Sequence, residues 1–247
     1  MNKNIRFFGC SHTASNLLGY HYIHSSGQPE LYKNIIFQST PYTNYLGNRI
    51  GVSYPKLISD ELDGEMIINA RPGFSNDMIL DSLLNDLNNI KKDDFVIIQL
   101  THFVRFDFPF KDGTIWKRDG WQLNSDIKYN TNEYMQYFNT ISNFNEYFSN
   151  LAVNRIFKII NYIYENITKN VYVFSWDIPS KELLENTELF NFINFISIND
   201  KISVQEGIIS VISNSTIKGE TNGIIDDTHL GEIGNRILSE ILLNKLK

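Results

Sequence analysis

Residues 5–13 read Ile-Arg-Phe-Phe-Gly-Cys-Ser-His-Thr, a short apolar run that stops at Gly9 and passes into a serine. An apolar run of this length that ends at a turn residue is typical of a strand buried inside a sheet. The strongest strand pattern in the chain is Phe95 to Leu100, which reads FVIIQL. Further runs predict strands at residues 66–68, 171–174 and 192–198.

Amphipathic helical patterns separate these strand-like runs. We expect helices over residues 54–62, 79–90, 134–167 and 233–246. Ser75 or Asn76 can cap the second of them. Strands that alternate with helices predict a mostly parallel sheet covered on both faces, which is a three-layer α/β/α domain with about five strands.

The length of 247 residues fits a single domain over residues 1–247. Two stretches, 17–53 and 103–132, interrupt the regular alternation, and both are rich in aromatic residues, histidine and asparagine. Long loops in compact domains usually carry function or are disordered. We expect these two stretches to be insertions around the mouth of a site.

The composition excludes several classes of function. A net charge of −6 argues against binding of a nucleic-acid backbone as the main role. No run approaches the roughly 20 apolar residues that span a bilayer, and the N-terminus lacks a signal-peptide pattern, so a soluble cytoplasmic protein is expected. The single cysteine, Cys10, cannot form an intramolecular disulfide. His21, His24 and His102 show no metal-ligand spacing, and we expect neither a metal nor a cofactor.

Polar residues follow the predicted strands at the positions where ligands bind in parallel sheets. Ser11 follows the first strand, and Gly73 and Asn76 follow the second. Thr101 and Arg105 follow the third strand, and Asp226 with His229 precedes the last helix. A serine, a histidine, an orienting acid and hydrogen-bond donors for an oxyanion are the parts of a serine hydrolase.

These residues also resemble the signatures of a known family, the SGNH (GDSL-like) hydrolases. Gly9-Cys10-Ser11-His12-Thr13 is similar to the first signature, and Asn69 to Gly73 is similar to the second. Asp226-x-x-His229, with Leu230 and Gly234-Asn235, is similar to the last. The resemblance implies a flavodoxin-like α/β fold, a triad of Ser11, Asp226 and His229, and an oxyanion hole that includes the backbone N–H of Gly73. Together the matches run through the chain in the family's order.

One signature departs from the family pattern. An asparagine normally follows the third strand and donates to the oxyanion, but Phe103 occupies that place here. Thr101, His102, Arg105 or Asn76 is then the candidate replacement. Loss of one such donor typically costs about 2.7–4 kcal/mol of transition-state stabilisation, so the departure bears directly on the rate.

Structural alternatives stay open for several of these residues. Ser11 could cap a helix, and Asp226 or Asp227 could cap the last one. Cys10 is expected to be a small buried residue, and His12 could line the pocket or sit in the core. The aromatic loop that contains Trp116 could pack as a lid or stack on sugars.

The family resemblance and the aromatic, asparagine-rich insertions together favour hydrolysis of an ester, with O-acetyl groups on a carbohydrate as the expected substrate. A carbohydrate O-acyltransferase with the same triad is the nearest alternative. A non-catalytic carbohydrate-binding protein on a degenerate hydrolase scaffold is a second alternative, which Phe103 keeps open. The expected partner is a small-molecule or carbohydrate ester, without nucleic acid or membrane.

Overall fold

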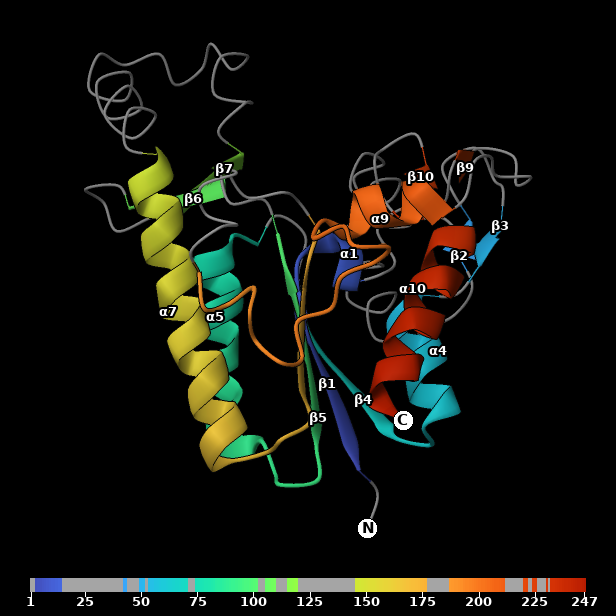
Figure 1. Ribbon diagram of the computed structural model, residues 1–247, viewed down its shortest axis with the longest axis horizontal. Coiled ribbons are helices and arrows are strands. Elements are labelled where there is room, and N and C mark those ends of the chain that lie inside the picture. The colour runs from blue at the N-terminus through green and yellow to red at the C-terminus, as the bar shows by residue number, and fades with distance from the viewer. Residues whose placement is uncertain are drawn as a thin grey trace.

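The protein contains a four-stranded, wholly parallel sheet at its centre, as shown by a computed structural model (Figure 1). The structure describes residues 3–14, 42–43, 49–51, 53–70, 74–101, 105–109, 115–119, 145–176, 187–211, 220–221, 224–225, 230 and 232–247. The strands are β1 (Asn4–Gly9), β4 (Glu65–Ala70), β5 (Phe95–Leu100) and β8 (Val171–Ser175). They lie in the order β4-β1-β5-β8, so the first strand is internal.

Helices cover both faces of the sheet. On one face lie α5 (Asn76–Asp86) and α7 (Asn145–Asn166), and on the other lie α4 (Tyr54–Glu61) and α10 (Glu232–Leu246) (Figure 1). The side chain of Ser75 caps α5 by accepting a hydrogen bond from the backbone N–H of Met78, as its position in the sequence predicts. The expected three-layer α/β/α architecture is confirmed.

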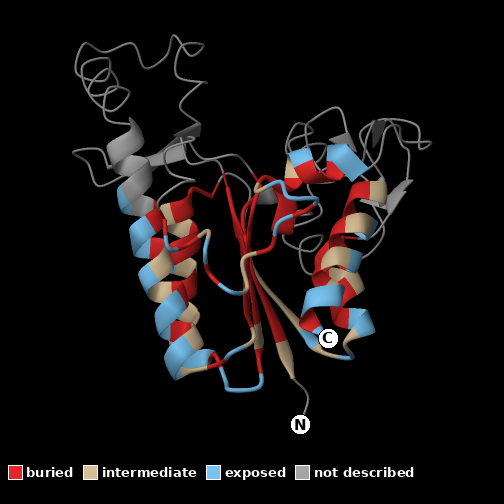
Figure 2. Cartoon of the chain, viewed as in Figure 1, coloured by how far each residue is buried: buried red, intermediate tan, exposed pale blue. Residues whose placement is uncertain are grey.

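The strands of the sheet are largely buried between the two pairs of helices (Figure 2), and their side chains alternate between two core layers. In β5, Val96, Ile98 and Leu100 pack toward α5 and α7, whereas Ile97 packs toward α4 and α10. In β1, Phe8 joins the first layer and Ile5 and Phe7 join the second. Strands buried on both faces explain why these segments are almost continuously apolar in the sequence.

The fifth strand expected at residues 192–198 is not formed, and this prediction was wrong. Two consecutive tight turns occupy the segment, in which the N–H of Phe192 donates to Leu189 and the N–H of Phe195 donates to Phe192. Beside β8 the segment keeps an isolated parallel bridge between Val173 and Phe195, in which the N–H of Val173 donates to Asn194 and the N–H of Ile196 donates to Val173. Beyond that bridge the N–H of Ile198 donates to Lys201 in a further turn, so no continuous ladder forms.

Several short elements complete the described part of the chain. A 3₁₀ helix, η1 (Leu87–Asn89), extends α5, and α9 (Val204–Val211) follows the turns. The two-stranded ribbon β2 (Tyr42–Thr43) with β3 (Arg49–Gly51) lies within the first expected insertion. A second ribbon, β6 (Arg105–Pro109) with β7 (Ile115–Asp119), lies within the other. The last pair is β9 (Glu220–Thr221) with β10 (Ile224–Ile225).

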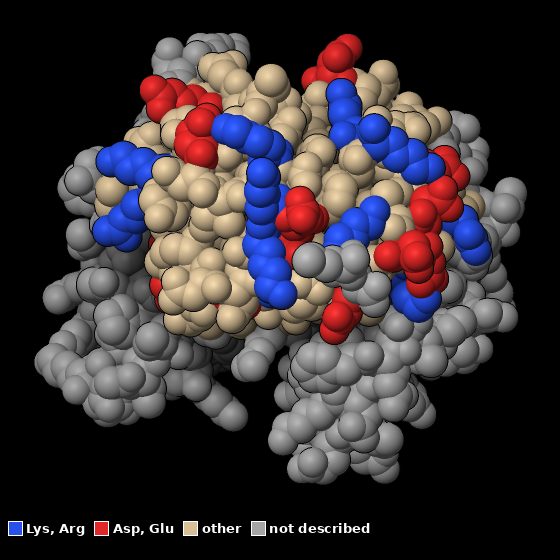
Figure 3. All heavy atoms as spheres, turned by 90° about the horizontal axis from the view of Figure 1, so that it is seen from below, with Lys and Arg blue, Asp and Glu red and all other residues tan. Residues whose placement is uncertain are grey.

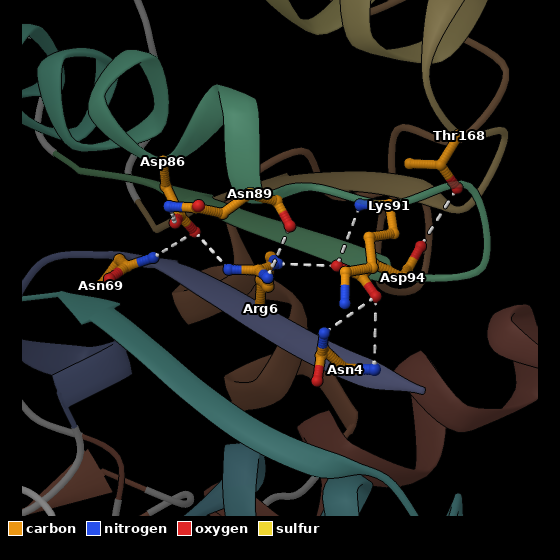
Figure 4. Close-up of polar contacts among 8 residues, drawn as sticks. All are labelled: Asn4, Arg6, Asn69, Asp86, Asn89, Lys91, Asp94 and Thr168. Atoms are coloured by element: carbon orange, nitrogen blue, oxygen red, sulfur yellow. Dashed lines mark hydrogen bonds and ion pairs between the residues drawn. The ribbon is translucent and has the colours of Figure 1, made fainter. Parts of the chain in front are cut away.

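A buried cluster of charged and polar groups ties β1 to the start of β5 (Figure 4). The guanidinium of Arg6, in the internal strand β1, donates to the carboxylates of Asp86 and Asp94 at 2.6 and 2.8 Å and to the carbonyl of Asn89 at 2.8 Å. Asp94 also accepts hydrogen bonds from Asn4 and from the backbone of Lys91. This cluster compensates the cost of burying a guanidinium within the core.

The carboxyl group of Asp94 gives this cluster a pH dependence. Burial alone would raise the pKa of Asp94, but the hydrogen bonds from Arg6, the Lys91 backbone and Asn4 outweigh burial and hold the pKa below its ordinary value. Such a group stabilises the fold above its unfolded pKa of about 3.9, and the contribution is lost as the pH falls through the lower folded pKa. Thermal unfolding is followed by circular dichroism at a series of pH values from about 5 downward. We expect the thermal midpoint to fall more steeply with decreasing pH in the parent than in Asp94→Asn. Equal slopes would contradict this assignment.

The face at the amino ends of the strands shows a mixture of charges (Figure 3). Lysine and arginine side chains alternate there with aspartate and glutamate. Among the described side chains of this face there is no field of one sign that would attract a polyanion. No helix among the described residues is both long enough and apolar enough to cross a membrane.

Candidate active site

The carboxyl ends of β1 and β5 form the point where the order of the strands reverses. From β1 the chain passes to β4 on one side, and then returns to β5 on the other. In sheets of this order, which is that of flavodoxin, ligands bind in the crevice beyond the carboxyl ends at this switch point. Phe8 in β1 pairs with Ile98 in β5. Ser11 lies three positions after Phe8, and Thr101 lies three positions after Ile98, so both residues lie equally far beyond this pair.

Ser11 is the first residue of the short helix α1 (Ser11–Ala14), directly beyond the end of β1. The preceding glycine is required by packing, because a Cβ at Gly9 would lie 2.1 Å from Thr13 Oγ1 and 2.8 Å from Gln99 Oε1. The N–H of Thr13 donates to the carbonyl of Cys10 at 3.1 Å and closes the turn. The Gly-x-Ser sequence therefore provides a tight strand-to-helix turn that fixes the backbone at Ser11.

Gln99 holds this turn from the neighbouring strand. Its Oε1 accepts hydrogen bonds from Thr13 Oγ1 at 2.7 Å and from the N–H of Cys10 at 3.4 Å. Its Nε2 donates to the carbonyl of Leu100 at 3.1 Å and approaches the Cys10 sulfur at 3.3 Å. A polar side chain inside the apolar strand β5 thus connects the two sides of the switch point.

Cys10 and His12, which flank Ser11, are both buried. The burial of Cys10 matches the expected structural role of that residue. The ring of His12 stacks on Trp176 with a centroid separation of 3.6 Å, across the end of β5. His12 therefore packs in the core beneath the edge of the sheet.

Thr101 and Asn76 are brought together. The N–H of Thr101 donates to Asn76 Oδ1 at 2.9 Å, and Asn76 Nδ2 donates to the Thr101 carbonyl at 3.2 Å. This paired contact fixes the start of α5 against the end of β5. The Thr101 hydroxyl itself is fully buried and has no hydrogen-bond partner among the described residues. A buried hydroxyl without a partner costs free energy and calls for an explanation.

The remaining expected site residues cannot be placed. Gly73, Asp226 and His229 lie outside the described residues, as do the side chains of Ser11 and Arg105. The helix α10 begins at Glu232, and Asp227, which with Asp226 is an alternative cap for it, also lies outside the described residues. His21, His24 and His102 also lie outside the described residues, and the described part of the chain contains no cluster of metal-ligating side chains.

The sequence interpretation gave no supporting role to four polar residues of this site: Thr13, Tyr54, Gln99 and Asn235. Thr13 and Asn235 lie within the segments that resemble the first and last family signatures. All four are buried. The sequence does contain a signal for Gln99, which is the polar residue in an otherwise apolar strand. A polar side chain buried in such a strand requires hydrogen-bond partners, which indicates a structural role. The others become visible only when strands and helices that are distant in the sequence are brought together.

Comparison with known proteins gives structural matches only. The chain matches no protein-family model and no curated protein. Among solved structures, the chain is similar to a carbohydrate esterase whose active site is described as having divergent catalytic and non-catalytic binding functions. The two chains are 12% identical, with a TM-score of 0.42, and the match covers 99% of this chain and 68% of the other. An acetyl xylan esterase from the rumen bacterium Butyrivibrio proteoclasticus shows 10% identity, a TM-score of 0.43, and coverage of 99% and 63%. Protein YxiM from Bacillus subtilis shows 12% identity, a TM-score of 0.39, and coverage of 100% and 56%.

Two of these three solved structures are described as esterases. The chain spans less than two thirds of the length of two of them. At such identities residue roles do not transfer from one chain to another. The roles of individual residues therefore have to be inferred from the residues of this chain and from its own geometry.

Proposed function

We propose that this protein is a serine ester hydrolase of the SGNH type that forms an acyl-enzyme on Ser11. The observation that supports this proposal most strongly is the position of Ser11, directly after the internal strand β1 and beside the switch point of the sheet. The close packing of Gly9 against Thr13 and Gln99 gives that position a fixed backbone. A nucleophile has to be held in a defined geometry for attack, and this turn provides it.

The reaction follows from the residue types. His229 accepts the proton of the Ser11 hydroxyl as the oxygen attacks the ester carbonyl, and Asp226 orients the imidazole. The tetrahedral intermediate expels the alcohol, which takes the proton from His229, and leaves the acyl group on Ser11. Water then attacks the acyl-enzyme, with His229 as base, to release the acid. The backbone N–H groups of Ser11 and Gly73 stabilise the oxyanion.

The substrate that we propose is an O-acetyl group on a carbohydrate. The support comes from the aromatic and asparagine-rich composition of residues 17–53 and 103–132. Hydrolysis of a chromogenic acetate ester tests for the enzyme, because a protein that only binds carbohydrate releases no chromophore. Addition of an acceptor sugar then distinguishes hydrolysis, which yields free acetate, from acyl transfer, which yields an acetylated sugar.

Thr101 is the candidate that we favour as the replacement donor for the missing asparagine. Thr101 directly follows the strand β5, and its hydroxyl is buried without a hydrogen-bond partner among the described residues. No other described residue that directly follows a strand of the sheet has such a side-chain oxygen. Asn76 is the weaker candidate because its amide already bonds to the Thr101 backbone. Arg105 remains a candidate for anchoring an acidic substrate group.

The Thr101→Val variant tests this role. Valine keeps the shape of threonine and breaks no hydrogen bond within the described residues, so we expect the thermal midpoint to be retained. Loss of an oxyanion donor is expected to lower kcat by about 10²- to 10³-fold with KM unchanged. Steady-state kinetics with the chromogenic ester measure both constants.

Thr168→Val is the matched control for Thr101→Val. The Thr168 hydroxyl donates to the carbonyl of Asp94 and accepts from the N–H of Asn170 at the opposite end of the sheet. This variant should lower the thermal midpoint without changing kcat. An unchanged kcat in Thr101→Val would exclude the hydroxyl as a donor.

A further inference from the structure

A buried asparagine in α10 contacts the segment that carries the proposed base. Asn235 Nδ2 donates to the carbonyl of Leu230 at 3.0 Å, and both residues are buried. Leu230 follows His229 directly in the chain and packs in the core layer beneath α4 and α10. The amide of Asn235 therefore fixes the carbonyl of the residue that follows the proposed base.

The same amide contacts the start of α4. Asn235 Oδ1 accepts the N–H of Tyr54 at 2.9 Å, and Tyr54 is the first residue of that helix. N–H groups in the first turn of a helix have no partner within the helix, so the side chain from α10 satisfies one of them. Asn235 thereby joins α4, α10 and the segment at Leu230.

The side chain of Tyr54 extends this contact to the turn at Ser11. Its hydroxyl lies 2.7 Å from Thr13 Oγ1, which lies 2.7 Å from Gln99 Oε1. Because an amide oxygen only accepts, the single hydroxyl proton of Thr13 is directed at Gln99, and Tyr54 must donate to Thr13. Burial raises the pKa of the Tyr54 phenol, so the donor stays protonated.

These contacts form one continuous path of hydrogen bonds, which we call the buried relay: Leu230, Asn235, Tyr54, Thr13, Gln99 and Cys10. Its ends are the residue after His229 and the residue before Ser11. The side chains of Thr13, Tyr54 and Gln99 are fully buried, so water does not replace a missing link. Buried polar networks of this kind hold a specific arrangement, whereas apolar packing tolerates small shifts.

From this geometry, and on the basis of the proposed function, we infer that Thr13, Tyr54 and Asn235 are positioning residues that hold the nucleophile Ser11 in register with the base His229. None of the three acts on the substrate. Proton transfer between Ser11 and His229 requires hydrogen-bond reach, and a displacement of about 1 Å in such a pair can lower the rate about 10²-fold. The relay holds Leu230, which follows His229, and Cys10, which precedes Ser11, through the same buried groups.

Thr13→Val and Tyr54→Phe test the relay, since each removes one hydroxyl and little volume. We expect kcat for the chromogenic acetate ester to fall about 10- to 100-fold, with KM within twofold of the parent. Modification of Ser11 by a fluorophosphonate should slow by a similar factor. Thr13→Ser, which keeps the hydroxyl, should restore both rates.

The control is again Thr168→Val, which loses buried hydrogen bonds at the other end of the sheet. It should lower the thermal midpoint at least as much as Tyr54→Phe and leave kcat and the labelling rate within twofold of the parent. If the parent is active and labelled at Ser11 but both relay variants behave like this control, the relay has no positioning role. If the parent neither hydrolyses the ester nor is labelled, the proposed function fails and the inference fails with it.

Discussion

Ser11→Ala is expected to lower the rate of ester hydrolysis by at least about three orders of magnitude. The serine hydroxyl is the only group that we propose to form the covalent intermediate, and its loss leaves only substrate binding and the oxyanion donors to assist attack by water. The substitution removes one hydroxyl from the first residue of the short helix α1 and leaves its backbone unchanged, so the variant should fold like the parent. Measurement of kcat/KM with the chromogenic acetate ester gives the effect.

The matched control for this substitution is Ser239→Ala. Ser239 is buried in α10, and its hydroxyl donates only to the carbonyl of Arg236 at 2.8 Å. Ser239→Ala should keep kcat/KM within about twofold of the parent, because it removes a hydrogen bond between two residues that lie three positions apart within α10. Turnover by Ser11→Ala within tenfold of the parent would show that another residue is the nucleophile.

Arg6→Met is expected to lower the free energy of unfolding by about 3–5 kcal/mol. Methionine fills a comparable volume but leaves the Asp94 and Asp86 carboxylates without their cation, and loss of one partner from a buried ion pair is strongly destabilising. The Arg6 guanidinium makes its three hydrogen bonds at the point where β1, η1 and the start of β5 meet (Figure 4). Urea unfolding followed by circular dichroism measures the change.

Lys247→Met provides the comparison for Arg6→Met on the surface. Lys247 pairs with Glu61 at 2.8 Å, and both side chains are more than half exposed to solvent. Exposed pairs contribute about 0–1 kcal/mol because water screens the charges. A loss of stability in Arg6→Met no larger than that in Lys247→Met would mean that the buried cluster contributes little.

The sequence predicts the central part of the fold well, because strong local patterns and tertiary packing agree there. Phe95–Leu100 is a strand with the predicted bounds, and the predicted cap at Ser75 begins α5. The missing fifth strand has an equally apolar sequence, but turns closed by its own backbone take its place. The helix α9 was not predicted because Gly207 weakens its pattern; the absence of a side chain there allows Ile198 to pack against the helix.

The site is predictable only in part. The strand-to-helix turn at Ser11 follows from Gly9 and the buried strand before it. The hydrogen bond from the Tyr54 N–H to Asn235 joins residues 181 positions apart, and no local sequence pattern predicts a contact between α10 and the start of α4. The pairing of Asn76 with the Thr101 backbone likewise depends on the register of β5 beside β1.

Covalent labelling tests the central claim most directly. A fluorophosphonate reacts with an activated serine when the hydroxyl oxygen attacks phosphorus and fluoride leaves, so each chain should gain the mass of one phosphonyl group. Peptide mapping by tandem mass spectrometry is expected to place that group on Ser11, with concomitant loss of ester hydrolysis and no label on Ser11→Ala. An active protein that remains unlabelled, or that carries the label on another residue while Ser11 stays free, would contradict the assignment of Ser11 as the nucleophile.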